Sequence, residues 1–280
     1  MREVAIVGAG ELGGAVAHVL ARRDVVRSLV LLDESGRVAS GKALDIAQAA
    51  PVEGFATQLA GTTDVATVAG SSIVIVAERF AGGAWSTEDG LLLLKRLTQT
   101  APRAVILCAG ASYRELVERG VRELGIDRRR LFGSAPEALA GGARALVALV
   151  ANGSPRDVAL SVLGVPPSHT VIPWEDATIG GFALTRQLDE PSRRRLAARI
   201  AALWPPGPYA LASAAAAVVA AMAGRSRRSA SCFVAPDTTS GTRARAAALP
   251  VRVDADGIAS VAQPSLSVVE RVALDNAMQI

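Results

Sequence analysis

The sequence is poor in cysteine and in aromatic residues, and each shortage excludes a class of protein. Its 280 residues include 2 cysteines, Cys108 and Cys232, which lie far apart. This excludes a disulfide framework and the paired-cysteine spacing of a zinc site, and it favours a reducing compartment. Aromatic residues make up 4% of the chain, and none lies within its arginine clusters. A nucleic-acid surface needs basic and aromatic side chains interleaved on one face, so we expect no nucleic-acid partner.

Lysine is also scarce, because Lys42 and Lys95 are the only two. The net charge of +4 therefore comes from arginine, which is densest at Arg128–Arg130, Arg193–Arg195 and Arg225–Arg228. We interpret these clusters as solvated helix ends and loops.

Long hydrophobic runs are missing as well. The uncharged stretch Pro205–Gly224 is continuously apolar only over Ala214–Ala223, which is too short to span a bilayer and is typical of a buried helix. Met1-Arg2-Glu3 leads into a short apolar stretch without the pattern of a signal peptide. We expect a cytoplasmic protein with no membrane partner.

The first half of the chain alternates between short apolar runs and segments with helical spacing. Strands are predicted at Val4–Val7, Leu29–Leu32, Ile73–Ala77, Val105–Cys108 and Leu131–Phe132, and helices at Glu11–Arg22, Val38–Ala50 with a stop at Pro51, Leu91–Thr98 and Ser112–Leu124. This alternation predicts an α/β fold, a doubly wound parallel sheet of the Rossmann type with helices on both faces.

The second half has a different pattern. Helices are predicted at Glu137–Ala151, Ser192–Leu203, Ala210–Ala223 and Ser265–Met278, with Ser265 as N-cap, and strands at Val158–Leu163, Val171–Trp174, Ser231–Val234, Leu249–Val253 and Ile258–Val261. This order indicates an α+β domain. We therefore predict a Rossmann domain at residues 1–134 and a C-terminal α+β domain at residues 135–280.

A dinucleotide fingerprint, G-x-G-x-x-G, lies between the first strand and the first helix. Gly8 permits a tight turn, Gly10 allows a pyrophosphate to approach the backbone, and Gly13 lets the helix pack closely on the strand. Backbone N–H groups at the helix start, around Glu11 and Leu12, attract phosphate. The alternative is a glycine-rich turn in a fold that binds no nucleotide.

Asp33 ends the second strand, twenty residues after Gly13. Its carboxylate can accept hydrogen bonds from ribose hydroxyls and would repel a 2′-phosphate. NAD is therefore the expected cofactor, rather than NADP.

Further residues carry a resemblance to a known family. The segment Gly41-Lys42-Ala43-Leu44-Asp45-Ile46-Ala47-Gln48-Ala49-Ala50-Pro51 resembles a helix of the lactate/malate dehydrogenase family. Trp85–Asp89, Val162–Gly164, Leu249–Val251 and Leu266–Ala277 resemble later pieces in the same order. The resemblance covers the whole chain and implies a C-terminal domain and hydride transfer with NAD.

The resemblance also implies catalytic residues that this sequence lacks. The family uses a histidine proton relay oriented by a carboxylate, arginines that hold the substrate, and an asparagine. The matching positions carry Ala81 and Thr87, Ala109-Gly110, Glu137, Ala140 and Pro166, and Glu78 replaces a glycine near the cofactor. Ordinary 2-hydroxy-acid dehydrogenase activity is therefore doubtful, and the substrate is unknown.

Nearby residues are candidates to replace the family's missing catalytic groups. His169 lies three residues past Pro166, Glu137 could orient it, and Arg144 could share the helical face of Glu137. Arg79 precedes the loop and could reach inward, whereas His18 is interpreted as a packing or surface residue. No metal site is predicted. Two functions stay open: an NAD(H)-binding oxidoreductase with a rebuilt pocket, or a non-catalytic NAD(H)-binding pseudoenzyme acting as a sensor or structural subunit.

A homodimer is expected through helices 41–50 and 210–223. Small side chains follow helical spacing at Ala43, Ile46, Ala47 and Ala50 and again at Ala212, Ala215, Ala216 and Val219. The two stripes fall where the resembled family forms its two-fold contact. Alternatively, each stripe packs on the core of its own chain.

Overall fold

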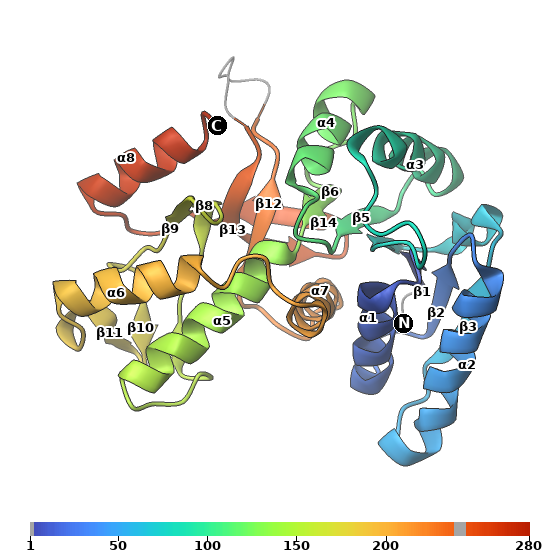
Figure 1. Cartoon of the computed structure of the whole chain (residues 1–280), viewed down its shortest axis with the longest axis horizontal. Helices are drawn as coiled ribbons and strands as arrows, with labels where there is room; N and C mark the ends of the chain where they lie inside the picture. Colours follow the sequence, from blue (N-terminus) through green and yellow to red (C-terminus); the bar gives the residue numbers. More distant parts are fainter. Residues whose placement is uncertain (1–2, 238–244) are drawn as a thin grey trace.

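A computed structural model describes residues 3–237 and 245–280, and its centre is a sheet of 11 strands (Figure 1). The order is β3-β2-β1-β4-β5-β6-β12-β13-β8-β9, with β14 paired to β13. These strands are β1 (Glu3–Val7), β2 (Ser28–Leu32), β3 (Gln58–Thr62), β4 (Ile73–Val76), β5 (Val105–Cys108), β6 (Leu131–Gly133), β8 (Leu163–Val165), β9 (His169–Val171), β12 (Ala230–Val234), β13 (Ala247–Asp254) and β14 (Gly257–Val261). The six strands from β3 to β6 are parallel and those beyond are antiparallel.

Helices cover both faces of the parallel part, which confirms the doubly wound α/β prediction. The helices are α1 (Glu11–Arg23), α2 (Gly36–Glu53), η1 (Val65–Gly70), α3 (Thr87–Thr100), α4 (Arg114–Leu124), α5 (Ala135–Val150), η2 (Leu184–Arg186), α6 (Glu190–Ala201), α7 (Pro208–Met222) and α8 (Val268–Ala277). One core cluster joins α1, α2 and α7 to one face, and a second joins η1, α3 and α4 to the other. Within the described ranges, none of these helices combines the length and the hydropathy that a membrane span requires.

The C-terminal half adds a third core cluster around α5, α6 and a small sheet. That sheet contains β7 (Val158–Ala159), β10 (Thr178–Ile179) and β11 (Phe182–Ala183). The predicted boundary at residue 134 falls between β6 and α5. The main sheet continues across it, because β12 pairs antiparallel with β6. The division into residues 1–134 and 135–280 stays a prediction.

Four element predictions need correction, two of them at helix ends. The second helix continues through Pro51 to Glu53 and is closed by Gly54, whose N–H donates to the Ala50 carbonyl at 2.9 Å. Pro51 lies in the last turn of this helix, so only two helical residues follow the position whose N–H is missing. The last helix is capped by Ser267 rather than Ser265, because Glu270 completes a capping box with Ser267.

The predicted strand Val158–Leu163 is also wrong, because the structure divides it between two sheets. Val158 pairs with β10 in the small sheet, whereas Leu163 belongs to β8 in the main sheet. Between them, the Val162 N–H donates to the Ser231 hydroxyl at 2.9 Å. The next strand, β9, covers His169–Val171 rather than Val171–Trp174.

The small-residue stripe of α7 lies inside the chain and not on its surface. Ala212, Ala215, Ala216 and Val219 are all 0% exposed, and α7 packs against α1 and α5 of the same chain. Small side chains allow this close approach of helices within one subunit. The dimer seam predicted through these α7 residues is therefore wrong, and the homodimer itself stays a prediction.

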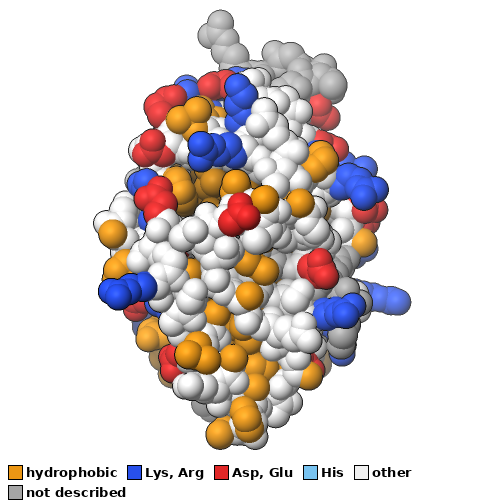
Figure 2. Space-filling model, turned by 90° about the vertical axis from the view of Figure 1, so that its right-hand side faces the viewer, with side chains coloured by type: hydrophobic (Ala, Val, Ile, Leu, Met, Phe, Trp, Pro, Cys, Tyr) orange, Lys and Arg blue, Asp and Glu red, His pale blue; other side chains and the backbone are white. Residues whose placement is uncertain are grey.

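The outer face of α2 does carry exposed apolar side chains. Leu44 is 61% exposed and Val52 is 88% exposed, whereas Ala43 and Ile46 of the predicted α2 stripe are buried in their own chain. Figure 2 looks onto the side of the molecule that carries α2, where hydrophobic side chains run down the middle of the face to its lower end.

Candidate functional site

The fingerprint glycines lie where β1 ends and α1 begins, with Gly10 as the N-cap of α1. A Cβ on Gly13 would lie 1.9 Å from the carbonyl oxygen of Gly8, so glycine is required for the close packing of helix on turn. Gly8 has a φ of +104°, a conformation that glycine adopts without strain. The structure thus brings Gly8, Gly10 and Gly13 together as predicted.

The segment after β4 presses directly against this loop. A Cβ on Gly8 would lie 2.3 Å from the Glu78 carbonyl oxygen, and a Cβ on Gly10 would lie 2.4 Å from the Glu78 Cγ. The Gly10 N–H donates to the Glu78 carbonyl at 3.0 Å. The first two glycines therefore make room for the chain itself as well as for any ligand.

The Glu78 carboxylate contacts the start of α1. Its Oε1 accepts a hydrogen bond from the Leu12 N–H at 2.9 Å. Leu12 is the second residue of α1, so this N–H has no partner inside the helix and lies at the positive end of the helix dipole. The Glu78 carboxylate of the same chain thus occupies a backbone N–H group of the kind that binds phosphate.

Asp33 lies beside the same loop, as the sequence predicts, and it is buried. Its Oδ2 accepts hydrogen bonds from the N–H groups of Ala9 at 2.7 Å and Phe80 at 3.0 Å. Its Oδ1 accepts one from the Ser35 N–H at 2.9 Å. Because a carboxylate oxygen has two acceptor positions, Oδ1 retains one for a ribose hydroxyl.

Lys42 also contacts this loop, although the motif that contains it indicates no role for it. Its Nζ donates to the Gly10 carbonyl at 2.6 Å, which places a cation at the glycine loop. The available signal was the position of one of the two lysines on the helix that follows Asp33. The sequence predicts that Glu78 replaces a glycine near the cofactor, but its contact with Leu12 depends on tertiary structure.

A cavity of about 420 Å³ opens beside the loop, at the carboxyl ends of β4 and β5. Its walls are Leu12, Glu78, Ala84, Gly110, Ala111, Ser112, Tyr113, Trp204, Pro205 and Leu211. Trp204, Pro205 and Leu211 come from the C-terminal half and close the cavity on that side. Among the described residues that line it, Glu78 alone is charged, and there is no histidine or arginine.

Tyr113 brings a phenolic proton to the cavity wall, but that proton is already used in a hydrogen bond. Its hydroxyl donates to the Ala77 carbonyl at 3.2 Å and accepts from the Trp85 N–H at 3.3 Å. Burial raises the pKa of Tyr113 well above its usual value, because the phenolate is poorly solvated there. Tyr113 is therefore protonated at neutral pH and serves to close the loop after β4.

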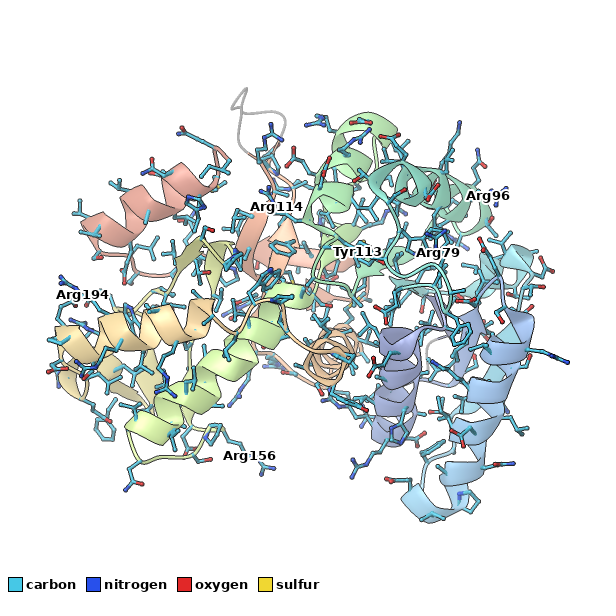
Figure 3. The ribbon with its side chains drawn as sticks, in the orientation of Figure 1. Arg79, Arg96, Tyr113, Arg114, Arg156 and Arg194 are labelled. Carbon is cyan, nitrogen blue, oxygen red and sulfur yellow. The ribbon has the colours of Figure 1, made fainter. Side chains whose placement is uncertain are left out.

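Arg79 does not reach this cavity. Its guanidinium lies over the Trp85 ring, 4.5 Å from the centroid, and its Nη2 lies 3.9 Å from an Asp89 oxygen. It lines a separate cavity of about 580 Å³ beside α3, together with Glu34. Figure 3 shows Arg79 and Tyr113 on the same side of the sheet, above the start of α1.

The predicted helical face of Glu137 and Arg144 is confirmed. Arg144 Nη1 donates to Glu137 Oε1 at 2.7 Å, and the other Glu137 oxygen accepts from the Ser231 N–H at 2.7 Å. This pair stabilises the junction between α5 and β12.

His169 lies in a different element, on β9 opposite Val165. No hydrogen bond joins His169 to Glu137 in the described part of the chain. The catalytic role of His169 and Glu137 stays a prediction. Within residues 3–237 and 245–280, no three side chains of histidine, cysteine, aspartate or glutamate gather to hold a metal ion.

Both cysteines are expected to resist alkylation in the folded protein. Cys108 and Cys232 are buried and free, and burial raises the pKa of Cys108 to about 12. Because the thiolate is the reactive form, iodoacetamide at pH 7.5 should modify neither, whereas the unfolded chain should react twice. Mass spectrometry checks this, and rapid modification of the native protein would contradict it.

Comparisons with known proteins agree with the family resemblance that the sequence carries. A family model described as the NAD binding domain of lactate/malate dehydrogenase matches residues 2–84. A malate dehydrogenase from Thioalkalivibrio sulfidiphilus is 31% identical over 208 residues, which cover 71% of this chain and 68% of that protein. A malate dehydrogenase from Desulforudis audaxviator is 28% identical over 99% of this chain and 95% of its own length.

The fold also matches solved structures. A lactate dehydrogenase from Cryptosporidium parvum, solved with lactic acid and nicotinamide adenine dinucleotide, aligns with a TM-score of 0.89 and 19% identity. The alignment covers 99% of this chain and 94% of that one. Together with the family model, this confirms the expected fold class and an NAD-binding N-terminal segment.

Proposed function

This chain belongs to the lactate/malate dehydrogenase family, and on that basis we propose that it binds NAD(H) but has lost ordinary turnover of malate and lactate. The observation that carries the proposal is the cavity beside the glycine loop. Its described wall contains one charged side chain, Glu78, and that charge is negative. We interpret the protein as a sensor or structural subunit that binds the dinucleotide without turnover.

The chemistry of a 2-oxo acid explains why this cavity is unsuitable. The substrate carries a carboxylate, which needs a cation close by, and its carbonyl oxygen must receive a proton as the hydride arrives. Arg144 is held by Glu137 and Arg79 is held over Trp85. The acidic proton of Tyr113 is donated to a backbone carbonyl. None of these groups is available to hold or protonate such a substrate.

The residues present fit a dinucleotide in part. The glycine turn, the start of α1, Asp33 and Lys42 form one cradle, and NAD bound there would supply a hydride acceptor. In this chain Asp33 would orient a ribose hydroxyl, whereas Glu78 lies on the phosphate side of the cradle. A fluorescence titration with NADH, beside assays with a panel of 2-oxo acids, tests the proposal. Binding without turnover is expected, and no binding at millimolar NADH would contradict it.

A second candidate is an oxidoreductase with a rebuilt pocket for a neutral, apolar substrate. Most of the cavity wall is apolar, including Leu12, Trp204 and Leu211, and the ring of the partly buried Trp204 favours an apolar ligand. NADH oxidation in a panel of uncharged ketones and aldehydes would favour this candidate over a non-catalytic role. The cytoplasmic location and the homodimer stay part of the proposal, and the exposed apolar residues of α2 support the latter.

Asp33 is expected to set a preference for NAD(H) over NADP(H). Its carboxylate would repel a 2′-phosphate, and its free Oδ1 position suits a ribose hydroxyl. Asp33→Asn should weaken NADH binding and narrow the gap to NADPH, as measured by the dissociation constants of both ligands. Glu34→Gln, which changes the exposed neighbouring carboxylate, is the matched control and should preserve the gap. Equal affinity of the unmodified protein for NADH and NADPH would contradict the prediction.

A further inference from the structure

We propose that Glu78 is an internal competitor for the pyrophosphate of the dinucleotide, so that NAD(H) binds only when the Glu78 carboxylate leaves the start of α1. The inference rests on the NAD(H) binding proposed above. It assigns to Glu78 a role that sets affinity, which the glycine fingerprint alone does not indicate.

The position of the carboxylate carries the argument. Leu12 N–H donates to Glu78 Oε1 at 2.9 Å, and Gly10 N–H donates to the Glu78 carbonyl at 3.0 Å. In a dinucleotide fold the pyrophosphate is bound by N–H groups at this end of the first helix. With its side chain and its carbonyl, Glu78 therefore holds two of the N–H donors at the position where a phosphate would bind.

The steric fit around Gly10 supports the same conclusion as the hydrogen bonds. The Glu78 Cγ lies 2.4 Å from the point where a Cβ on Gly10 would be. The glycine that should let a phosphate approach the backbone is thus covered by a side chain of the same protein. A phosphate and the Glu78 carboxylate cannot share this position, since both are negative and both need the Leu12 N–H.

The cavity beside the loop has room for the Glu78 side chain once it leaves the start of α1. Glu78 already lines the space of about 420 Å³ beside Tyr113 and Trp204. In that orientation its carboxylate would lie in the space that the substrate of a dehydrogenase needs, and it would repel a 2-oxo acid. One residue would thereby lower the affinity for the dinucleotide and exclude anionic substrates once the dinucleotide is bound.

Dissociation constants for NADH test the inference in four proteins: the unmodified chain, Glu78→Gly, Glu78→Gln and the control Glu34→Gln. Glu78→Gly removes both the charge and the obstruction, so we expect NADH to bind at least tenfold more tightly. Glu78→Gln keeps the shape and removes the charge, so an intermediate gain is expected. Glu34→Gln removes an exposed carboxylate at the same edge of the sheet and should change affinity less than threefold. Circular dichroism confirms that each variant is folded.

The outcomes separate this inference from the proposed function. Tighter binding by both Glu78 variants than by the unmodified chain supports the inference. Equal affinity in all four proteins overturns it and leaves NAD(H) binding in place. Absence of binding in all four proteins, each of them folded, overturns both the inference and the proposed function.

Discussion

Oxaloacetate and pyruvate are expected to be reduced by NADH with a kcat/KM at least about 10⁴-fold below that of an ordinary member of the family. A positioned proton relay contributes about 10² to 10⁴-fold, and the sequence predicts that Pro166, which has no proton to give, takes the place of the family's histidine. Ala81, Thr87 and Ala140 are predicted to take the places of its substrate arginines. In the structure, no arginine among the described residues lines the cavity in their place.

The measurement is the loss of NADH absorbance at saturating cofactor, with an ordinary malate dehydrogenase as the positive control. The NADH titration shows in parallel that the cofactor is bound, so that absence of turnover cannot be attributed to an empty protein. A kcat/KM within tenfold of the control would refute the prediction. It would then direct attention to His169, whose substitution by Asn should abolish that activity.

Ala216→Arg is expected to unfold the protein rather than to dissociate a dimer. Ala216 is 0% exposed within a single chain, and it belongs to the core cluster that joins α7 to α1 and the sheet. An arginine there would be a large, unpaired buried charge, which destabilises by about 3–5 kcal/mol or more. That loss is comparable with the whole stability of many domains, about 5–15 kcal/mol.

Ser213→Arg is the matched control, because Ser213 lies on the exposed side of the same helix. Thermal unfolding followed by circular dichroism should show a native melting curve for Ser213→Arg. For Ala216→Arg it should show either no folded protein or a melting temperature lower by more than about 10 °C. A well-folded Ala216→Arg monomer with an unchanged melting temperature would contradict the burial of α7 and restore the interface interpretation.

The parallel half of the fold could be predicted because its signals are local. Val4–Val7, Ile73–Val76 and Val105–Cys108 are apolar runs, and each is followed by a segment with helical spacing. Parallel strands buried on both faces need such runs, so sequence and structure agree there. The edge strand Gln58–Thr62 was missed because it is polar and only partly buried, so it lacks this signal.

The C-terminal half is harder to predict from the sequence because its short strands pair with partners that are distant along the chain. Val158–Leu163 looks like one strand, yet its two ends pair with β10 and β9 in different sheets. The stripe on α7 illustrates the same difficulty. Small residues at helical spacing indicate a close helix contact, but only the packing of the whole chain decides whether the partner is α1 of the same subunit or another copy.

Residue identity and spacing are enough to recognise the glycine turn and the carboxylate at the end of the second strand, and they predict that Pro166 replaces the family's proton relay. These depend on residue identity at fixed spacing along one short stretch of chain. Tertiary structure alone decided that Glu78 holds the Leu12 N–H, because 66 residues separate the two and β1 and β4 must pair before they meet. It also decided that the second carboxylate oxygen of Glu137 accepts a hydrogen bond from the N–H of Ser231, 94 residues further along the chain. The chemistry of this site therefore depends on contacts between segments whose separation in sequence conceals them.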